Sequence, residues 1–303
     1  MNRLKVVLSL ITRDNDYQLE QAKSAEGVAN LQNVDLEIFY ADSNSVTQSS
    51  QLLDQIHKHK AGLAAILVEP AGGTEFPQVG RAAVSAGIGW VVLNRDASSL
   101  TDLRRNFHVP IFAVSSDHRQ VGHIQAQQIA AVVPGAATVL YVQGPAGSLA
   151  SQQRLAGVEE AKSKDVTLKI LKSPNWTEEG GYHAVSSWLR LTTSQKQPIS
   201  AVVGQNDFIA IGARKAFEEV NPELPSGPWL QIPFMGVDGL PRTGQTFVNR
   251  GLLIATVVVP PVAGQALEAV VKAITTKTTP QELHLIPSYS FPAIETLRPR
   301  SGA

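Results

Sequence analysis

The sequence predicts an α/β fold of two lobes, each a doubly wound parallel sheet with helices on both faces. Short apolar runs alternate with amphipathic helical stretches along nearly the whole chain, which is typical of parallel sheets connected by helices. Polar residues appear where the apolar runs stop, most clearly at 199–213, where Gln205-Asn206-Asp207 interrupts the apolar pattern. A chain of 303 residues is also long enough for roughly two domains.

The first half of the chain contains four strand–helix units. Apolar residues after the strands recur at helical spacing. Gly87 is expected to be the C′ residue that ends one of these helices. The strands are expected at 5–11, 35–40, 63–68 and 89–93, with helices at about 18–31, around 52–56 and at 76–86. This repetition predicts one parallel sheet that is covered on both faces.

A second series of the same kind follows the strand at 111–114. Its strands are expected at 138–142, 167–171, 199–203 and 234–237, with helices at about 120–133, 149–163, 181–192 and after Gly204. Asp207 is expected to be the N-cap of the last of these helices, because a side-chain oxygen there can accept from the first turn.

The remaining residues add an apolar run at 252–259, a helix at about 262–275 and a final extended stretch near 283–290. We therefore expect several crossings between the lobes. The predicted N-terminal lobe comprises 1–116 plus about 260–288, and the predicted C-terminal lobe comprises 117–259 plus about 289–303.

Composition excludes several classes of function. Lys plus Arg equals Asp plus Glu at 26 each, so no net field favours nucleic acid or an acidic membrane. The absence of cysteine excludes disulfides, thiolate nucleophiles and Cys-ligated metals. No apolar segment approaches the length of a membrane span, and the N-terminal apolar run is too short for a signal peptide. The protein is therefore expected to stay inside the cell unless the sequence begins at a mature boundary.

The chain lacks the common catalytic motifs. It contains no G-x-S-x-G, Walker loop, H-E-x-x-H, or G-x-G-x-x-G after the first strand. His118 and His123 are five residues apart, a spacing that does not bring both onto one helical face for zinc. The turn Gln143 to Gly147 fits either a phosphate cradle or a simple tight turn. We expect no enzyme activity, no cofactor and no metal site.

Six segments together resemble a known family. They are LNRD at 93–96, VSSDHRQVGHIQAQQI at 114–129, QGPAGSLASQQRLAGVEEA at 143–161, GQNDFIAIGA at 204–213, MGVDG at 235–239 and LLIATVVVPPVAGQALEAV at 252–270. In this order they resemble the type I periplasmic sugar-binding proteins, above all the ribose-binding-protein branch. The effector-binding core of LacI-type repressors has the same fold.

The resemblance implies two lobes that are joined by a hinge of several strands and close on a ligand in the cleft between them. It implies a solute-binding protein of an ABC-type sugar uptake system, working as a monomer with an ABC permease. Such a protein is expected in the periplasm if the sequence begins at a mature boundary, and in the cytoplasm otherwise. The alternative is a ligand-sensing protein of a signalling or regulatory system, coupled to a membrane sensor. A DNA-binding repressor is not expected, because the first strand begins at Lys5 and leaves no room for a helix-turn-helix.

The resemblance also implies which side chains bind the ligand. Arginine forks and amide or carboxylate groups suit hydroxyls, and aromatic rings suit the apolar face of a sugar. The residues that match are Asn15, Tyr17, Arg95, Arg154, Trp176, Asn206 and Asp238, with Asp117 assigned either to the pocket or to the lobe crossing. The alternatives that remain are Asp14 or Asp16 in place of Asn15, surface roles for the two arginines, a core role for Trp176, and a bracing role for Asp238.

This chain departs from the ribose branch at several of these positions. It has Asn94 where that branch has Asp, Glu69 where it has Asn, Gln18 where a second aromatic is frequent, and valines at 257–259 where it has Gln. Ribose is therefore not the expected ligand. We expect another monosaccharide, a polyol, or a sugar-like ligand with a donor for Glu69, provided that Glu69 faces the cleft and not solvent.

Overall fold

The computed structural model describes residues 3–58, 62–73, 76–95, 100–133, 135–191, 198–220 and 232–299. The chain forms two compact units: unit 1 is Met1–Ser116 with Pro261–Ile286, and unit 2 is Asp117–Pro260 with Pro287–Ala303. Each unit contains one sheet of six strands within the described residues. The predicted fold class is therefore confirmed.

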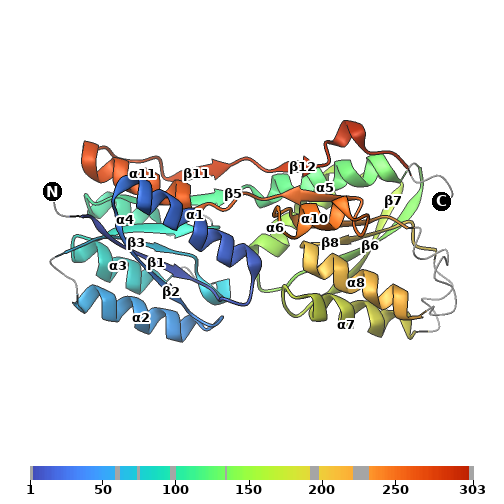
Figure 1. Cartoon of the computed structure of the whole chain (residues 1–303), viewed down its shortest axis with the longest axis horizontal. Coiled ribbons are helices and arrows are strands. Elements are labelled where there is room, and N and C mark those ends of the chain that lie inside the picture. Colours follow the sequence, from blue (N-terminus) through green and yellow to red (C-terminus); the bar gives the residue numbers. More distant parts are fainter. Residues whose placement is uncertain are drawn as a thin grey trace. The chain divides into compact units, whose positions relative to one another are not determined.

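The sheet of unit 1 is parallel throughout, in the order β11-β5-β4-β3-β1-β2 (Figure 1). Its strands are β1 (Lys5–Leu10), β2 (Asp35–Tyr40), β3 (Leu63–Val68), β4 (Gly89–Leu93), β5 (Ile111–Ser116) and β11 (Leu283–Ile286). Its helices are α1 (Asp16–Gln32), α2 (Ser45–Lys58), α3 (Pro77–Ser85), α4 (Leu100–Asn106) and α11 (Ala263–Thr276).

Apolar residues of unit 1 are buried on both faces of its sheet. Val6 and Leu8 of β1 pack with α1 and α11, whereas Val7 between them packs with α2, α3 and α4. Successive side chains of a strand point to opposite faces, so a strand that is apolar at every position must be covered twice. This explains why the inner strands β3 and β4 are continuous apolar runs.

The sheet of unit 2 has the order β12-β10-β9-β8-β6-β7 and is parallel except at β12, which runs antiparallel to β10. Its strands are β6 (Ala137–Gln143), β7 (Val166–Lys172), β8 (Ala201–Gly204), β9 (Phe234–Asp238), β10 (Ala255–Val258) and β12 (Tyr289–Phe291). Its main helices are α5 (His118–Val132), α6 (Leu149–Ala161), α7 (Glu178–Leu189), α8 (Asp207–Val220) and α10 (Gly244–Asn249).

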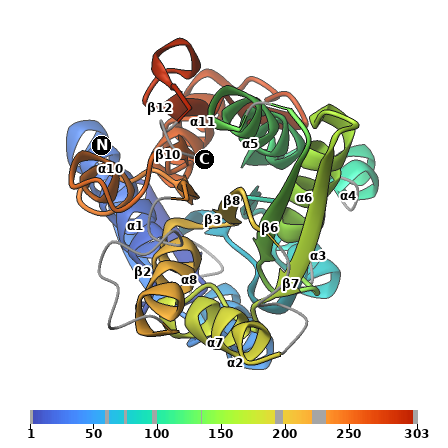
Figure 2. The ribbon, with the colours of Figure 1, turned by 90° about the vertical axis from the view of Figure 1, so that its right-hand side faces the viewer.

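The helices of unit 2 pack in two pairs. Helix α7 lies along α8 in the end-on view of Figure 2, and α5 lies along α6. The α7–α8 pair covers one face of the sheet through Val185 and Ile209, and the α5–α6 pair covers the other through Ile129 and Val158.

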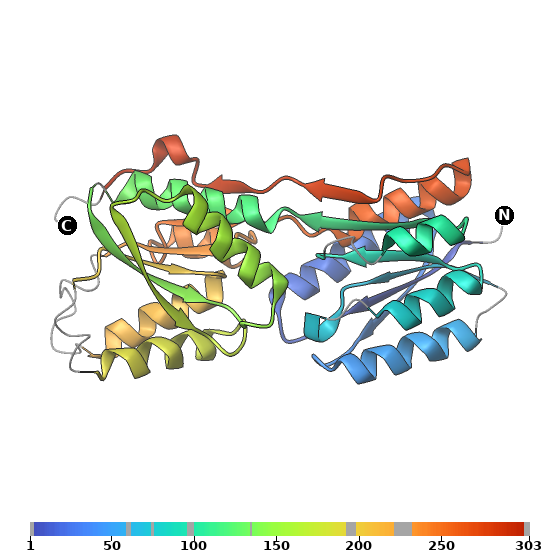
Figure 3. The same ribbon diagram turned by 180° about the vertical axis from the view of Figure 1, so that it is seen from behind.

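The final extended stretch is divided between the two sheets. The expected single element near 283–290 is two strands: β11 pairs with β5 in unit 1, and β12 pairs with β10 in unit 2 (Figure 3). The chain therefore passes between the units three times, after Ser116, Pro260 and Ile286. Within the described ranges, no helix has both the length and the apolar character needed to span a bilayer.

Candidate functional site

The predicted site residues lie near the carboxyl ends of the strands, in one group in each unit. Open parallel sheets bind ligands at this edge, where the connecting loops present polar side chains. In unit 1 the group is Asn15 and Tyr17 after β1, Glu69 after β3, and Asn94 and Arg95 after β4. In unit 2 it is Asp117 at the start of α5, Arg154 in α6, Trp176 after β7, Asn206 after β8 and Asp238 at the end of β9.

Asn94 presents an unpaired acceptor in unit 1. Its backbone adopts a left-handed conformation with φ of 53°, and its side chain is buried. The side-chain Nδ2 donates to the hydroxyl of Tyr17 at 3.4 Å. Its Oδ1 is buried without a hydrogen-bond partner among the described residues. An unsatisfied buried acceptor costs free energy, so this oxygen is suited to a donor from a bound molecule.

Glu69 is buried and does not face solvent. Its relative exposure is 4%, and its Oε2 accepts from Nε2 of Gln21 at 3.1 Å. The other end of that amide, Oε1 of Gln21, accepts from the backbone N–H of Ala263 at 2.8 Å, at the start of α11. The carboxylate is therefore held by a residue 48 positions away in sequence. A direct contact from Glu69 to a ligand stays a prediction.

Arg95 and Asn15 make local contacts in this structure. The guanidinium of Arg95 donates to the carbonyl of Asn94 at 2.7 Å and to the carbonyl of Pro70 at 3.0 Å. Oδ1 of Asn15 accepts from the backbone N–H groups of Tyr17 and Gln18, at 2.8 and 3.3 Å, which makes Asn15 the N-cap of α1. Their roles as ligand contacts remain predictions.

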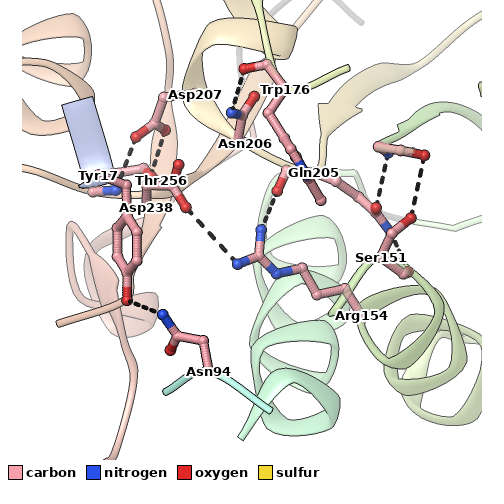
Figure 4. A network of polar contacts seen from close by, with 12 residues as sticks. Tyr17, Asn94, Ser151, Arg154, Trp176, Gln205, Asn206, Asp207, Asp238 and Thr256 are labelled. Atoms are coloured by element: carbon pink, nitrogen blue, oxygen red, sulfur yellow. Dashed lines mark hydrogen bonds and ion pairs between the residues drawn. The ribbon is translucent and has the colours of Figure 1, made fainter. Parts of the chain in front are cut away.

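Arg154 is the centre of the group in unit 2 (Figure 4). It is buried, so the alternative of a solvated helix face is wrong. One terminal nitrogen donates to the carbonyl of Gln205, and the other lies 3.8 Å from Oδ1 of Asp238. The guanidinium carbon lies 5.6 Å from the centroid of the Trp176 ring, within cation–π range. The Nε of Arg154 is buried and has no hydrogen-bond partner in the described part of the chain.

The ring of Trp176 lies against Gly144 in the turn after β6. A Cβ at position 144 would come within 2.4 Å of the ring, so only glycine permits this approach. The backbone N–H of Gly144 donates to Oε1 of the buried Gln205 at 2.9 Å, and Nε2 of Gln205 donates to the carbonyl of Ser151 at 2.8 Å. The turn at 143–147 is thus shaped around an aromatic side chain.

Asn206, and not Asp207, caps α8. Oδ1 of Asn206 accepts from the backbone N–H of Ile209 at 2.8 Å, and its Nδ2 donates to the carbonyl of Trp176 at 2.9 Å. The expectation that Asp207 is the N-cap is therefore wrong. Helix α8 begins at Asp207, so its N-cap position is the preceding residue, Asn206. Asn206 instead joins the start of α8 to the loop that carries Trp176.

Asp207 points into unit 2 and bridges two strands. Its carboxyl group accepts from the Thr256 hydroxyl on β10 at 2.6 Å and from the backbone N–H of Gly239 after β9 at 2.8 Å. Burial raises the pKa of Asp207 well above its usual value, and the charge of Asp238 raises it further. This bridge has no local signature in the sequence, because its partners lie 32 and 49 positions along the chain.

The two acids among the predicted site residues of unit 2 are at element ends. Asp117 is the N-cap of α5, and its Oδ1 accepts from the backbone N–H of Gln120 at 3.0 Å. Asp238 ends β9 with φ of 104°, which is rare for a residue with a side chain. Its carboxylate faces Arg154 (Figure 4).

Other features of the described residues lie apart from these groups. No cluster of three or more potential metal ligands occurs in the described ranges. A groove of about 380 Å³ runs along α11 and β11 in unit 1, between Glu268, Lys272 and His284. It is lined by none of the predicted site residues.

Comparison with known proteins identifies the family. Residues 6–278 match the family model described as a periplasmic binding protein domain. The chain is 28% identical over 245 residues to the xylitol-binding protein of Mycolicibacterium smegmatis, a match that covers 80% of this chain and 64% of that protein. The galactofuranose-binding protein of Escherichia coli is 22% identical over 94% of this chain and 86% of its own length.

A solved structure shows the same fold. The ABC transporter periplasmic solute-binding protein from Actinobacillus succinogenes, solved with bound D-allose, is 23% identical. It superposes with a TM-score of 0.81 over 95% of this chain and 97% of its own. Because the family model covers most of the sequence, this chain belongs to the periplasmic binding protein family.

Proposed function

We propose that this chain is the solute-binding protein of an ABC-type uptake system and that its ligand is a monosaccharide, a polyol or a similar polyhydroxylated molecule. The observation that carries the proposal is the arrangement around Arg154. A buried guanidinium faces a carboxylate, stacks near an indole ring and keeps its Nε without a partner among the described residues. Fork-shaped donors, carboxylate acceptors and aromatic faces together suit the hydroxyls and carbon skeleton of such a ligand.

Unit 1 contributes complementary chemistry. Oδ1 of Asn94 is a buried acceptor, and the hydroxyl of Tyr17 lies beside the same side chain. The ligand donates a hydrogen bond to Oδ1 of Asn94, and binding shifts the conformational population toward the ligand-bound form. The names of the relatives, a xylitol-binding and a galactofuranose-binding protein, support a polyhydroxylated ligand.

Asn94 and Glu69 favour a ligand other than ribose. An amide at position 94 both donates and accepts, whereas a carboxylate in that place would only accept. Glu69 is buried with one donor, Nε2 of Gln21, bonded to its Oε2. Xylitol is the first ligand to test, because each of its carbons carries a hydroxyl that can satisfy these acceptors.

The proposed localisation is the periplasm, where the protein acts as a monomer, without catalysis, cofactor or nucleic acid. Its proposed partner is an ABC permease. Loss of xylitol uptake in cells that lack this protein supports the permease partner. Uptake that persists, together with a lost response to the ligand, supports the sensing role instead.

The first experiment measures unfolding temperature against pentoses, hexoses, polyols, amino sugars and nucleosides. A ligand at one hundred times its dissociation constant stabilises the folded state by about 2.7 kcal/mol, which is a measurable shift. A response to a sugar or polyol supports the proposal. A screen without any response in these classes contradicts it.

Titration calorimetry of the ligand that responds then tests the two groups. Arg154→Met removes charge-assisted hydrogen bonds worth about 1.5–3 kcal/mol, so affinity falls roughly 10- to 100-fold. Asn94→Ala in unit 1 weakens binding of the same ligand. The matched control is Arg119→Met, which removes an exposed arginine paired with Glu160 on the outer faces of α5 and α6. Equal affinities of all three variants would contradict the assignment of the site.

A further inference from the structure

The carboxyl group of Asp207 is enclosed by four segments of unit 2. Asp207 is the first residue of α8, and its carboxyl group bonds to the backbone N–H of Gly239 in the loop after β9 and to the hydroxyl of Thr256 on β10. A Cβ at Gly236 would lie 2.2 Å from its Oδ1, and a Cβ at Gly244 would lie 2.0 Å from its Oδ2. The glycines leave room for this carboxyl group and for little else.

The bond to Gly239 reaches the turn that carries Asp238. Asp238 and Gly239 have successive positive φ angles, 104° and 58°. Such a conformation of a residue with a side chain costs free energy and persists only where its surroundings hold it. The backbone N–H that donates to Asp207 belongs to Gly239 in this turn. The carbonyl of Asp238 in the same turn accepts from the N–H of Val259 at 3.0 Å.

The surroundings of Asp207 favour the neutral form of its carboxyl group over the charged form. Burial and the negative charge of Asp238 both raise the pKa of Asp207, and Arg154 lowers it by a smaller amount. A neutral Asp207 avoids placing two carboxylates side by side. It keeps both contacts, because the Thr256 hydroxyl can accept a hydrogen bond as well as donate one.

We propose that Asp207 is a positioning residue for ligand binding: it holds the Asp238–Gly239 turn through the backbone N–H of Gly239 and so aims the Asp238 carboxylate toward Arg154. The inference rests on the proposed function for the role of Asp238 as a ligand contact. Asp207 itself is buried and acts through its neighbour.

A double-mutant cycle with xylitol as the probe tests this coupling. Asp207→Ala weakens xylitol affinity at least about 10-fold in the wild-type background, and less than about 2-fold in the Asp238→Ala background, because coupled residues are not additive. Asp207→Asn stays within about 3-fold of wild type, since an amide can accept from Gly239 and donate to Thr256. Equal losses in the two backgrounds would overturn the proposal.

Thr256→Val is the control for a purely structural role. It removes the bond to β10 but leaves the bond to the turn. We expect lower stability toward urea and an affinity within about 2-fold of wild type, because the two contacts serve different segments. A loss of affinity as large as that of Asp207→Ala would contradict a role through the turn.

A measurement without ligand separates this proposal from the proposed function. Amide hydrogen exchange of Gly239, followed by NMR, is at least about 10-fold faster in Asp207→Ala than in Asp207→Asn, because only the amide keeps the acceptor. Asp207→Ser, whose side chain is too short to hold both contacts, replaces Asp207→Ala if that variant is unfolded. If the exchange rate of Gly239 is the same in both variants, the proposal is overturned. If exchange is faster in Asp207→Ala but xylitol does not bind to the wild type, only the choice of ligand is contradicted.

Discussion

Gly144 determines where the ring of Trp176 lies. A Cβ at this position would come within 2.4 Å of the ring, and the contact with Arg154 depends on the present ring position. We expect Gly144→Ala to displace the ring and weaken ligand affinity roughly 2- to 10-fold, because the proposed contact between the ring and the ligand is worth about 0.5–1.5 kcal/mol. Titration calorimetry measures the affinity.

Gly147 in the same turn provides the matched control. A Cβ there would meet no atom within 4 Å. Gly147→Ala is therefore expected to keep wild-type affinity and stability. If both alanine variants bind equally well, the ring of Trp176 does not contribute to the site.

The position of Arg154 depends on how its helix, α6, packs against α5. A Cβ at Gly122 of α5 would lie 2.2 Å from the carbonyl oxygen of Arg154, and a Cβ at Gly157 of α6 would lie 2.0 Å from the carbonyl oxygen of Arg119. The two backbones are thus in direct contact. The helix that carries Arg154 is therefore packed against α5 through main-chain contact at these glycines.

Gly157→Ala is expected to force these helices apart, because the atom it meets is backbone and cannot rotate away. Overpacking of this kind costs about 1–3 kcal/mol of unfolding free energy. Affinity falls as well, since Arg154 moves with α6. Urea unfolding and calorimetry measure the two effects.

Gly27→Ala in α1 is the control for that substitution. Its Cβ would meet nothing within 4 Å, so only the helix propensity changes. We expect a gain of about 0.5–1 kcal/mol in stability and unchanged affinity. A loss of stability equal to that of Gly157→Ala would contradict the packing argument.

At the scale of the whole molecule, the buried Asp207 links stability to pH. An acid whose pKa is raised on folding stabilises the folded state below its ordinary pKa, 3.8, and this contribution is lost as pH rises through the raised value. The charged groups that face it are Asp238, which raises the pKa, and Arg154, which lowers it. We expect the unfolding free energy to fall with rising pH across this window.

Asp207→Asn removes the titrating group while keeping its shape, so the difference in unfolding free energy between wild type and this variant isolates the effect. Urea unfolding at a series of pH values from about 4 to 8 measures it. As pH rises, the unfolding free energy of the wild type is expected to fall relative to that of Asp207→Asn. A difference that stays constant across the series would show that Asp207 does not titrate there.

The sequence determined the architecture because its information is local. Apolar runs such as 63–68 and 199–203 are continuous where a strand is covered on both faces, and the helices between them repeat at their own period. The same pattern placed polar residues such as Asn94, Asn206 and Asp238 at or directly after strand ends, where the structure also has them. Their roles as ligand contacts stay predictions.

Tertiary structure alone decided how the polar groups are used. Asn206 and Asp207 are adjacent acceptors that local rules cannot separate, yet one caps α8 and the other bonds to residues 32 and 49 positions away. The stretch near 283–290 is one extended segment in sequence, but its two halves join different sheets. Periodicity in the sequence shows which face of a helix or strand is buried. A hydrogen bond between segments that are distant in sequence depends on how these elements pack, and no local pattern in a single sequence specifies that packing.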